Sequence, residues 1–310
     1  MMYSNHNKIP ICVLAALFLM QLSVIDSMAQ GFEGYYRFPD VHKDQIVFVA
    51  EGDLWTVSLK GGLARRITTH AEEELYPAIS PDGKTIAYTA NYEGPAEIYT
   101  IPFNGGIPTR WTYERDNSQA NGWTPDGKIL YDTRAYSTLP DRQLVTIDLQ
   151  SGEKKRIPLS QASEGSFDEN GKTVFFVRPA FHRNVTKRYK GGTARQIWKY
   201  TDGEDEAIKL TNDFSGGSHH PLYHDGRVYF ITDRDGTMNI WSMDVNGKDL
   251  KQHTEHKGFD IRYAKIWEGS IVYQLGADIW HYEVDSDVSS KVQITLQSDL
   301  DQMREKWVEN

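Results

Sequence analysis

The sequence predicts an all-β fold, a six-bladed β-propeller of four-stranded antiparallel blades, and the main reason is an internal repeat. The clearest copy runs from Tyr76 to Tyr88 and contains the turn Pro81-Asp82-Gly83. Similar segments open at Phe38, Tyr76, Gly122, Phe167, Pro221 and Ala264, which makes six units. Their third strands align at Leu54, Ile98, Leu144, Ile197, Ile240 and Ile279, a spacing of roughly 40 to 50 residues that is typical of propeller blades.

Each unit carries the signals of short strands joined by tight turns. Alternating β-branched and aromatic residues mark strands such as 46–49 and 227–231. Asp-Gly or Asn-Gly turns, which tolerate a positive φ, lie between the first and second strands at Asp82, Asp126, Asn170 and Asp225. The tryptophans of the third strands, expected to pack between neighbouring blades, are Trp55, Trp198, Trp241 and Trp280.

Four antiparallel strands per blade predict a propeller with two unlike faces. The turns between strands one and two and between strands three and four share one face, which we call the short-turn face. The longer connections, 134–142, 179–193 and the crossing 113–120 between blades two and three, lie on the opposite, loop-rich face. Because loops on a rigid scaffold usually carry binding function, we expect the binding surface on the loop-rich face.

The loop-rich face gathers basic residues within an acidic chain. Lys and Arg number 34 against 43 Asp and Glu, which gives a formal net charge of −9 and argues against a nucleic acid partner. The predicted substrate-binding residues are Arg115, Arg134, Arg142 and Arg188. They would form a rim that attracts a carboxylate such as a peptide C-terminus. The alternative is that these arginines are solvated or pair with Asp116 and Asp141.

The N-terminus predicts export. Lys8 precedes an apolar run over 9–24, and Ser27-Met28-Ala29 has the small-x-small pattern of a cleavage site, so residues 1–29 are expected to be a signal peptide. A membrane anchor is the alternative, but the run is short for a bilayer span of about 20 residues. The mature protein would be periplasmic or extracellular, free of the membrane, and without a thiol, because Cys12 is the only cysteine.

Catalytic and metal-binding motifs are weak in this chain. There is no G-x-S-x-G elbow, so no hydrolase nucleophile is expected and we assign no catalytic residue. His219, His220 and His224 resemble metal ligands, but no third ligand type accompanies them, and a regular strand would direct neighbouring side chains to opposite faces. We therefore expect neither a metal nor a cofactor.

Several segments resemble the tricorn protease family. They are Arg188–Thr193 followed by Gln196-Ile197-Trp198, Asp53-Leu54-Trp55, and Gly122–Gly127, within a resemblance that covers about residues 32–296. The resemblance identifies the chain as the N-terminal six-bladed propeller of a tricorn-type serine peptidase. It implies a larger polypeptide that continues into a seven-bladed propeller and then into peptidase domains with a PDZ-like module.

The resemblance also implies a peptide-handling role, with one departure. Family members anchor the C-terminal carboxylate of the substrate with paired arginines in the crossing before blade three, whereas this chain has Glu114-Arg115-Asp116. Residues 32–296 would be the propeller and 297–310 a charged linker toward a following domain. The expected partners are peptides, the remaining domains of the parent enzyme and other copies of that enzyme.

Two other functions remain open from the sequence alone. One is a stand-alone, TolB-like propeller that binds a protein partner through the loop-rich face. The other is a propeller enzyme that uses polar groups around its central channel. The charged segment 297–310 favours the peptidase propeller over the first alternative, and the lack of an acid–base or metal constellation argues against the second.

Overall fold

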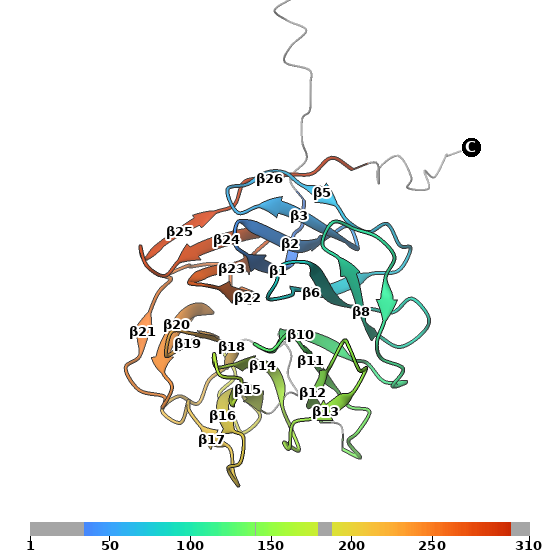
Figure 1. Cartoon of the computed structure of the whole chain (residues 1–310). Coiled ribbons are helices and arrows are strands. Elements are labelled where there is room, and N and C mark those ends of the chain that lie inside the picture. Colours follow the sequence, from blue (N-terminus) through green and yellow to red (C-terminus); the bar gives the residue numbers. More distant parts are fainter. Residues whose placement is uncertain (1–33, 140, 179–187, 299–310) are drawn as a thin grey trace, which may run out of the picture.

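The computed structural model describes residues 34–139, 141–178 and 188–298. Six four-stranded antiparallel sheets surround a common centre (Figure 1), so the predicted six-bladed propeller is confirmed. The predicted signal peptide, part of the loop 179–193, and linker residues 299–310 lie outside the described residues. No helix in the part of the chain that the structure describes is long and apolar enough to cross a bilayer.

The strands of each blade follow one another in the chain. Blade one contains β1 (Arg37–His42), β2 (Gln45–Ala50), β3 (Asp53–Ser58) and β5 (Arg65–Arg66), and blade two contains β6 (Glu74–Ile79), β7 (Thr85–Ala90), β8 (Glu97–Pro102) and β9 (Thr109–Arg110). Blade three contains β10 (Gln119–Trp123), β11 (Ile129–Thr133), β12 (Gln143–Ile147) and β13 (Lys154–Arg156), and blade four contains β14 (Ser163–Phe167), β15 (Thr173–Arg178), β16 (Gln196–Thr201) and β17 (Ile208–Lys209). Blade five contains β18 (Ser218–His224), β19 (Arg227–Thr232), β20 (Asn239–Asp244) and β21 (Lys251–Gln252), and blade six contains β22 (Ile261–Trp267), β23 (Ser270–Leu275), β24 (Asp278–Glu283) and β25 (Val288–Lys291).

The strand registers place the turns on two faces as the sequence predicts. In blade three, Trp123 pairs with Ile129 at the end of the first hairpin, and Thr133 pairs with Gln143 at the opposite end. The Asp-Gly turns therefore lie on the short-turn face, where Gly83 and Gly127 adopt φ of 74° and 80°.

Apolar clusters fill the spaces between adjacent blades. Trp55 is fully buried, as expected for a core residue. Trp198, Trp241 and Trp280 are only half-buried at the edges of these clusters. The third strands thus place one tryptophan in the core and the other three at its margin.

One backbone hydrogen bond recurs at all six junctions between blades. The amide at the start of each first strand donates to the carbonyl of the residue just before the third strand of the preceding blade, at 2.7 to 2.9 Å. The pairs are Tyr36 with Ala277, Glu74 with Gly52, Ser118 with Ala96, Ala162 with Arg142, Ser218 with Arg195, and Ile261 with Met238. These bonds fix where every first strand begins along the channel.

A buried threonine supports this junction in four blades. Its hydroxyl accepts the amide of the second residue of the third strand and contacts the side chain of the first. The side-chain pairs are Asp53 with Thr68, Glu97 with Thr112, Gln196 with Thr211, and Asn239 with Thr254. Each pair spans fifteen residues, so each threonine ties a crossing to its blade.

The ring closes between blades six and one. Tyr36 donates to Ala277 across the closure, and β26 (Ile294–Thr295) runs parallel to β4 (Gly62–Leu63) on the outer side of blade one (Figure 1). The residues after blade six therefore fasten onto the edge of blade one without becoming part of its four-stranded sheet.

We predict that Thr211→Val destabilises the propeller. Thr211 is fully buried, accepts the Ile197 amide at 3.1 Å and donates to Gln196 Oε1 at 2.7 Å. Valine keeps the shape but leaves both groups unsatisfied, which should cost about 1 to 3 kcal/mol in the free energy of unfolding. Urea denaturation measures this loss. Thr211→Ser keeps the hydroxyl, and equal stability of the two variants would contradict the assigned role.

Candidate functional site

The first strand of each blade lines the centre of the ring and contains an irregularity in its pairing. The register between first and second strands shifts in all six blades, as expected at β-bulges. Four residues at these shifts adopt a left-handed conformation, with φ between 51° and 54°: Phe38, Tyr76, Glu164 and His220. Because such a residue turns its side chain out of the regular alternation, the bulges decide which groups meet around the channel.

An aromatic cluster joins neighbouring blades through their first strands. The ring of Phe38 lies 4.3 Å from that of Tyr76 and 5.4 Å from that of Tyr263, measured between centroids. Tyr263 also contacts the imidazole of His220 at 4.9 Å. Side chains from four consecutive blades, five, six, one and two, therefore meet here.

A charged network lies beside these rings. Lys265 donates to the carbonyl of Asn121 and interacts electrostatically with Asp40 and Glu164. Burial lowers the pKa of Lys265, while the two carboxylates oppose that shift. Burial likewise raises the pKa of Asp40 against the effect of Lys265. A cavity of about 20 Å³, enough for about one water molecule, is lined by Glu164, His220 and Lys265 among others.

Two adjacent histidines converge next to this network. The Nδ1 atoms of His219 and His220 lie 2.7 Å apart, and Nδ1 of His220 lies 3.3 Å from Oε2 of Glu164. The expectation that neighbouring strand residues point to opposite faces is wrong here, because His220 occupies a bulge. Burial, reinforced by the charge of Arg195, lowers the pKa of His219 well below its usual value, so this ring is neutral near pH 7.

On the loop-rich face, Glu114 organises the crossing between blades two and three. Its Oε1 atom accepts hydrogen bonds from Tyr131 at 2.5 Å, Tyr136 at 2.6 Å and Lys154 at 3.1 Å. Burial alone would raise the pKa of Glu114, but these three donors outweigh it and lower the pKa. Glu114 therefore acts as a structural anchor at the first position of Glu114-Arg115-Asp116.

Arg115 is presented on the turn that Glu114 anchors. It is exposed and adopts a φ of 58°, which is uncommon for a residue other than glycine. The carboxylate of Glu97 accepts the amides of Glu114 at 2.9 Å and Arg115 at 3.4 Å, and so supports this conformation. With the described residues, the Arg115 guanidinium forms no hydrogen bond or ion pair.

Two further predicted arginines contact the same crossing. Arg134 pairs with Asp116 at 3.0 Å, which agrees with the alternative of local ion pairs. Arg142 is almost fully buried, donates to the carbonyl of Asn117 at 2.8 Å and pairs with Asp132 at 2.7 Å. Its side chain is thus part of the interior, although it borders a 350 Å³ hollow formed with the loops of blade two.

Arg188 lies apart from the other three. It is exposed, has a φ of 56°, and its Nε atom donates to the carbonyl of Gly236 at 3.0 Å. This bond joins the long loop of blade four to a turn of blade five. The structure therefore gathers Arg115, Arg134 and Arg142 at one crossing and places Arg188 elsewhere on the loop-rich face.

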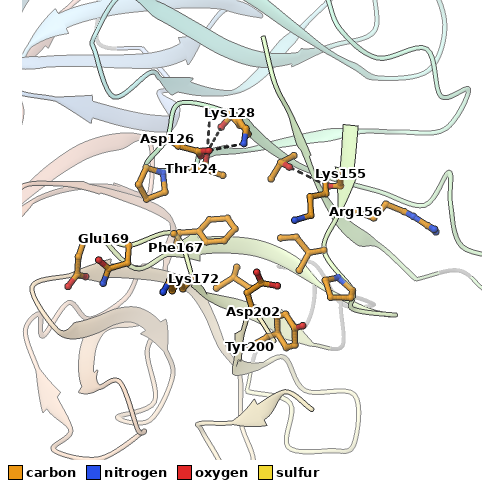
Figure 2. Close-up of a pocket in the computed structure, with 17 residues that line it drawn as sticks. Thr124, Asp126, Lys128, Lys155, Arg156, Phe167, Glu169, Lys172, Tyr200 and Asp202 are labelled. Atoms are coloured by element: carbon orange, nitrogen blue, oxygen red, sulfur yellow. Dashed lines mark hydrogen bonds and ion pairs between the residues drawn. The ribbon is translucent and has the colours of Figure 1, made fainter. Parts of the chain in front are cut away.

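The structure also contains a groove on the short-turn face that the sequence did not predict. It lies between blades three and four, has a volume of about 520 Å³, and includes the rings of Phe167 and Tyr200 (Figure 2). Its basic residues are Lys128, Lys155, Arg156 and Lys172, and its acidic residues are Asp126, Glu169 and Asp202. Lys128 is paired with Asp126 at 2.8 Å. The basic run 154–156 is the sequence signal that could have indicated this groove.

Comparison with known proteins decides the family. The family described as the tricorn protease N-terminal beta propeller domain matches residues 33–288. The chain belongs to the tricorn family. This confirms the resemblance to the tricorn protease family that the sequence predicts over about residues 32–296.

Individual tricorn proteins support the assignment. The chain is 30% identical over 249 residues to tricorn protease homolog 1 of Streptomyces coelicolor, covering 79% of this chain and 23% of that protein. It is 28% identical over 280 residues to a tricorn protease homolog of Saccharolobus solfataricus, covering 89% and 26%. A crystal structure of the tricorn protease matches with a TM-score of 0.78 and 27% identity, covering 86% of this chain and 27% of that one. The chain thus spans about a quarter of the length of these tricorn relatives.

We predict that Arg142→Ala is strongly destabilising. The Asp132 side chain is fully buried, and loss of its partner leaves a buried charge without its cation, which should cost about 3 to 5 kcal/mol. Arg134→Ala is the matched control, because that side chain is 44% exposed and its ion pair should contribute only about 0 to 1 kcal/mol. Chemical denaturation compares the two variants. In an Asp132→Asn background, Arg142→Ala should lower the free energy of unfolding by less than it does in the wild type. An equal loss in both backgrounds would argue against the ion pair.

Proposed function

We propose that this chain is the non-catalytic propeller of an exported tricorn-type serine peptidase, and that it handles peptide substrates or products on its loop-rich face. The observation that carries the proposal is Arg115, an exposed arginine on a left-handed turn whose backbone amides are held by the carboxylate of Glu97. A guanidinium presented on such a turn is suited to bidentate binding of a peptide carboxylate. The peptidase chemistry would come from other domains of the parent enzyme.

The contacts around the channel favour peptide binding on the surface of the propeller over passage of a peptide through the channel. The rings of Phe38, Tyr76 and Tyr263 contact one another along the first strands. Beside them, Lys265 of blade six donates to the carbonyl of Asn121 in the opposite blade three. An extended peptide would have to displace these rings together with the polar groups beside them. The 350 Å³ hollow on the loop-rich face, which Asn117 and Arg142 border, offers a binding place without such a rearrangement.

We predict that the chain binds unstructured peptides through their C-terminal carboxylate without cleaving them. Arg115→Ala should weaken binding roughly tenfold or more, since a hydrogen bond to a charged group contributes about 1.5 to 3 kcal/mol. Amidation of the peptide C-terminus should produce a similar loss, and the two losses should not add. Calorimetry measures the affinities, and mass spectrometry of the same samples should show intact peptide.

The control variant for this experiment is Lys60→Ala. It removes one exposed positive charge from a turn on the opposite face and should leave binding unchanged. Equal affinities for free and amidated peptides, or additive losses, would remove the carboxylate role from Arg115. Absence of peptide binding would favour the protein-binding module instead, and hydrolysis by the purified chain would overturn the non-catalytic assignment.

We also predict that the N-terminus directs export with cleavage after Ala29. Expression of the whole chain in a Gram-negative host should yield a periplasmic protein that begins at Gln30, which intact-mass measurement can establish. Ala29→Lys should block processing, because the cleavage site requires a small residue. An unprocessed chain in the cytosol, or one retained in the membrane, would contradict export as a mature soluble protein.

A further inference from the structure

The junction between blades four and five brings together three metal-ligating side chains. One donor atom each from Glu164, His219 and His220 lies within 4.8 Å of the others, and within the described residues this is the one such group of three. We propose that these residues form a binding site for a transition-metal ion such as Zn²⁺. The proposal is independent of peptide handling, because it concerns the interior of the ring.

The scaffold fixes the three donors before any ion arrives. Glu164 lies on β14 and the two histidines on β18, so the site spans two blades. Oε2 of Glu164 accepts the amide of His220 at 2.9 Å, which holds the carboxylate next to the bulge. That bulge, with a φ of 51° at His220, brings neighbouring imidazoles to the same side of the strand.

The types of donor select the class of ion. Two imidazole nitrogens and one carboxylate form the three-ligand set found in many zinc and other transition-metal centres with an open coordination position. Ca²⁺ and Mg²⁺ prefer sites made only of oxygen ligands. The adjacent 20 Å³ cavity, also lined by Glu164 and His220, has room for about one water molecule at the open position.

Two nearby cations limit the expected affinity of the site. Arg195 donates to Oε1 of Glu164 at 2.9 Å, while Oε2 of the same carboxylate lies 3.3 Å from Nδ1 of His220. Hydrogen bonding of a ligating carboxylate by an outer group is usual at metal sites. The positive charges of Arg195 and Lys265 still oppose a dication, so we expect weaker binding than at closed structural zinc sites.

Binding requires one small rearrangement. The imidazole nitrogens, now 2.7 Å apart, share one proton, and they must separate to about 3.3 Å to bind one ion in tetrahedral geometry. The ring that donates this proton moves it to its own Nε2 atom, and both rings stay neutral. A modest side-chain rotation therefore converts a histidine–histidine hydrogen bond into two metal ligands.

Metal titration of the whole chain, prepared without a histidine tag and stripped with chelator, tests the site. Calorimetry with Zn²⁺ should show one ion per chain, and Co²⁺ should give visible absorption typical of low-coordinate cobalt with nitrogen ligands. His220→Ala and Glu164→Gln should each weaken binding at least about tenfold, since each removes a ligand. His70→Ala, which removes an exposed histidine on a distant loop, should leave the affinity unchanged.

A gain-of-binding variant keeps the test independent of folding defects. Lys265→Met removes a positive charge beside the site without touching a ligand and should tighten Zn²⁺ binding several-fold. The proposal is overturned if the wild-type chain binds no ion. It is equally overturned if His220→Ala and Glu164→Gln bind as tightly as the wild type, or if Lys265→Met brings no gain while remaining folded by circular dichroism.

Discussion

The geometry of this propeller depends on one backbone hydrogen bond that is repeated at every junction between blades. The start of each first strand is held against the residue that precedes the third strand of the blade before it. This bond anchors the start of all six first strands, and in four of them the left-handed residue lies two positions after the anchored amide: Phe38, Tyr76, Glu164 and His220. The aromatic contacts of Tyr263, the charged network of Lys265 and the paired histidines follow from that alignment.

The repeat makes much of the fold predictable from sequence, because turn chemistry and strand periodicity act locally. Asp82-Gly83 indicates a hairpin whatever surrounds it. The bulges are harder to predict, since they depend on register between strands, yet Phe38-Pro39, Tyr76-Pro77 and His220-Pro221 mark three of them. Proline has no amide to donate to the ladder and so favours such positions. The fifteen-residue spacing between a polar residue and a threonine is a second sequence signal, and it marks four of the junctions between blades.

The candidate sites show where sequence reasoning reaches its limit. The clustering of arginines in the loops of an acidic chain identified the crossing between blades two and three. Three of the four predicted arginines lie in it or contact it. Their individual roles depend on side-chain partners that sequence does not reveal: Arg142 pairs with buried Asp132, while Arg115 stays exposed. The histidine pair was set aside because regular strand geometry was assumed, and a bulge with φ of 51° invalidates that assumption.

The closure of the ring has a consequence for the order in which the protein folds. Five junctions are bridged by the chain itself, whereas blades six and one are joined by Tyr36, by the two-residue pairing of β26 with β4, and by a shared apolar cluster. Blade one is built from a contiguous segment, so it can form on the ribosome long before Ile294 is synthesised. The closure is then the last contact to form. It is also the one junction between blades that can open without stretching a covalent connection. Slow local opening of the ring should therefore begin there.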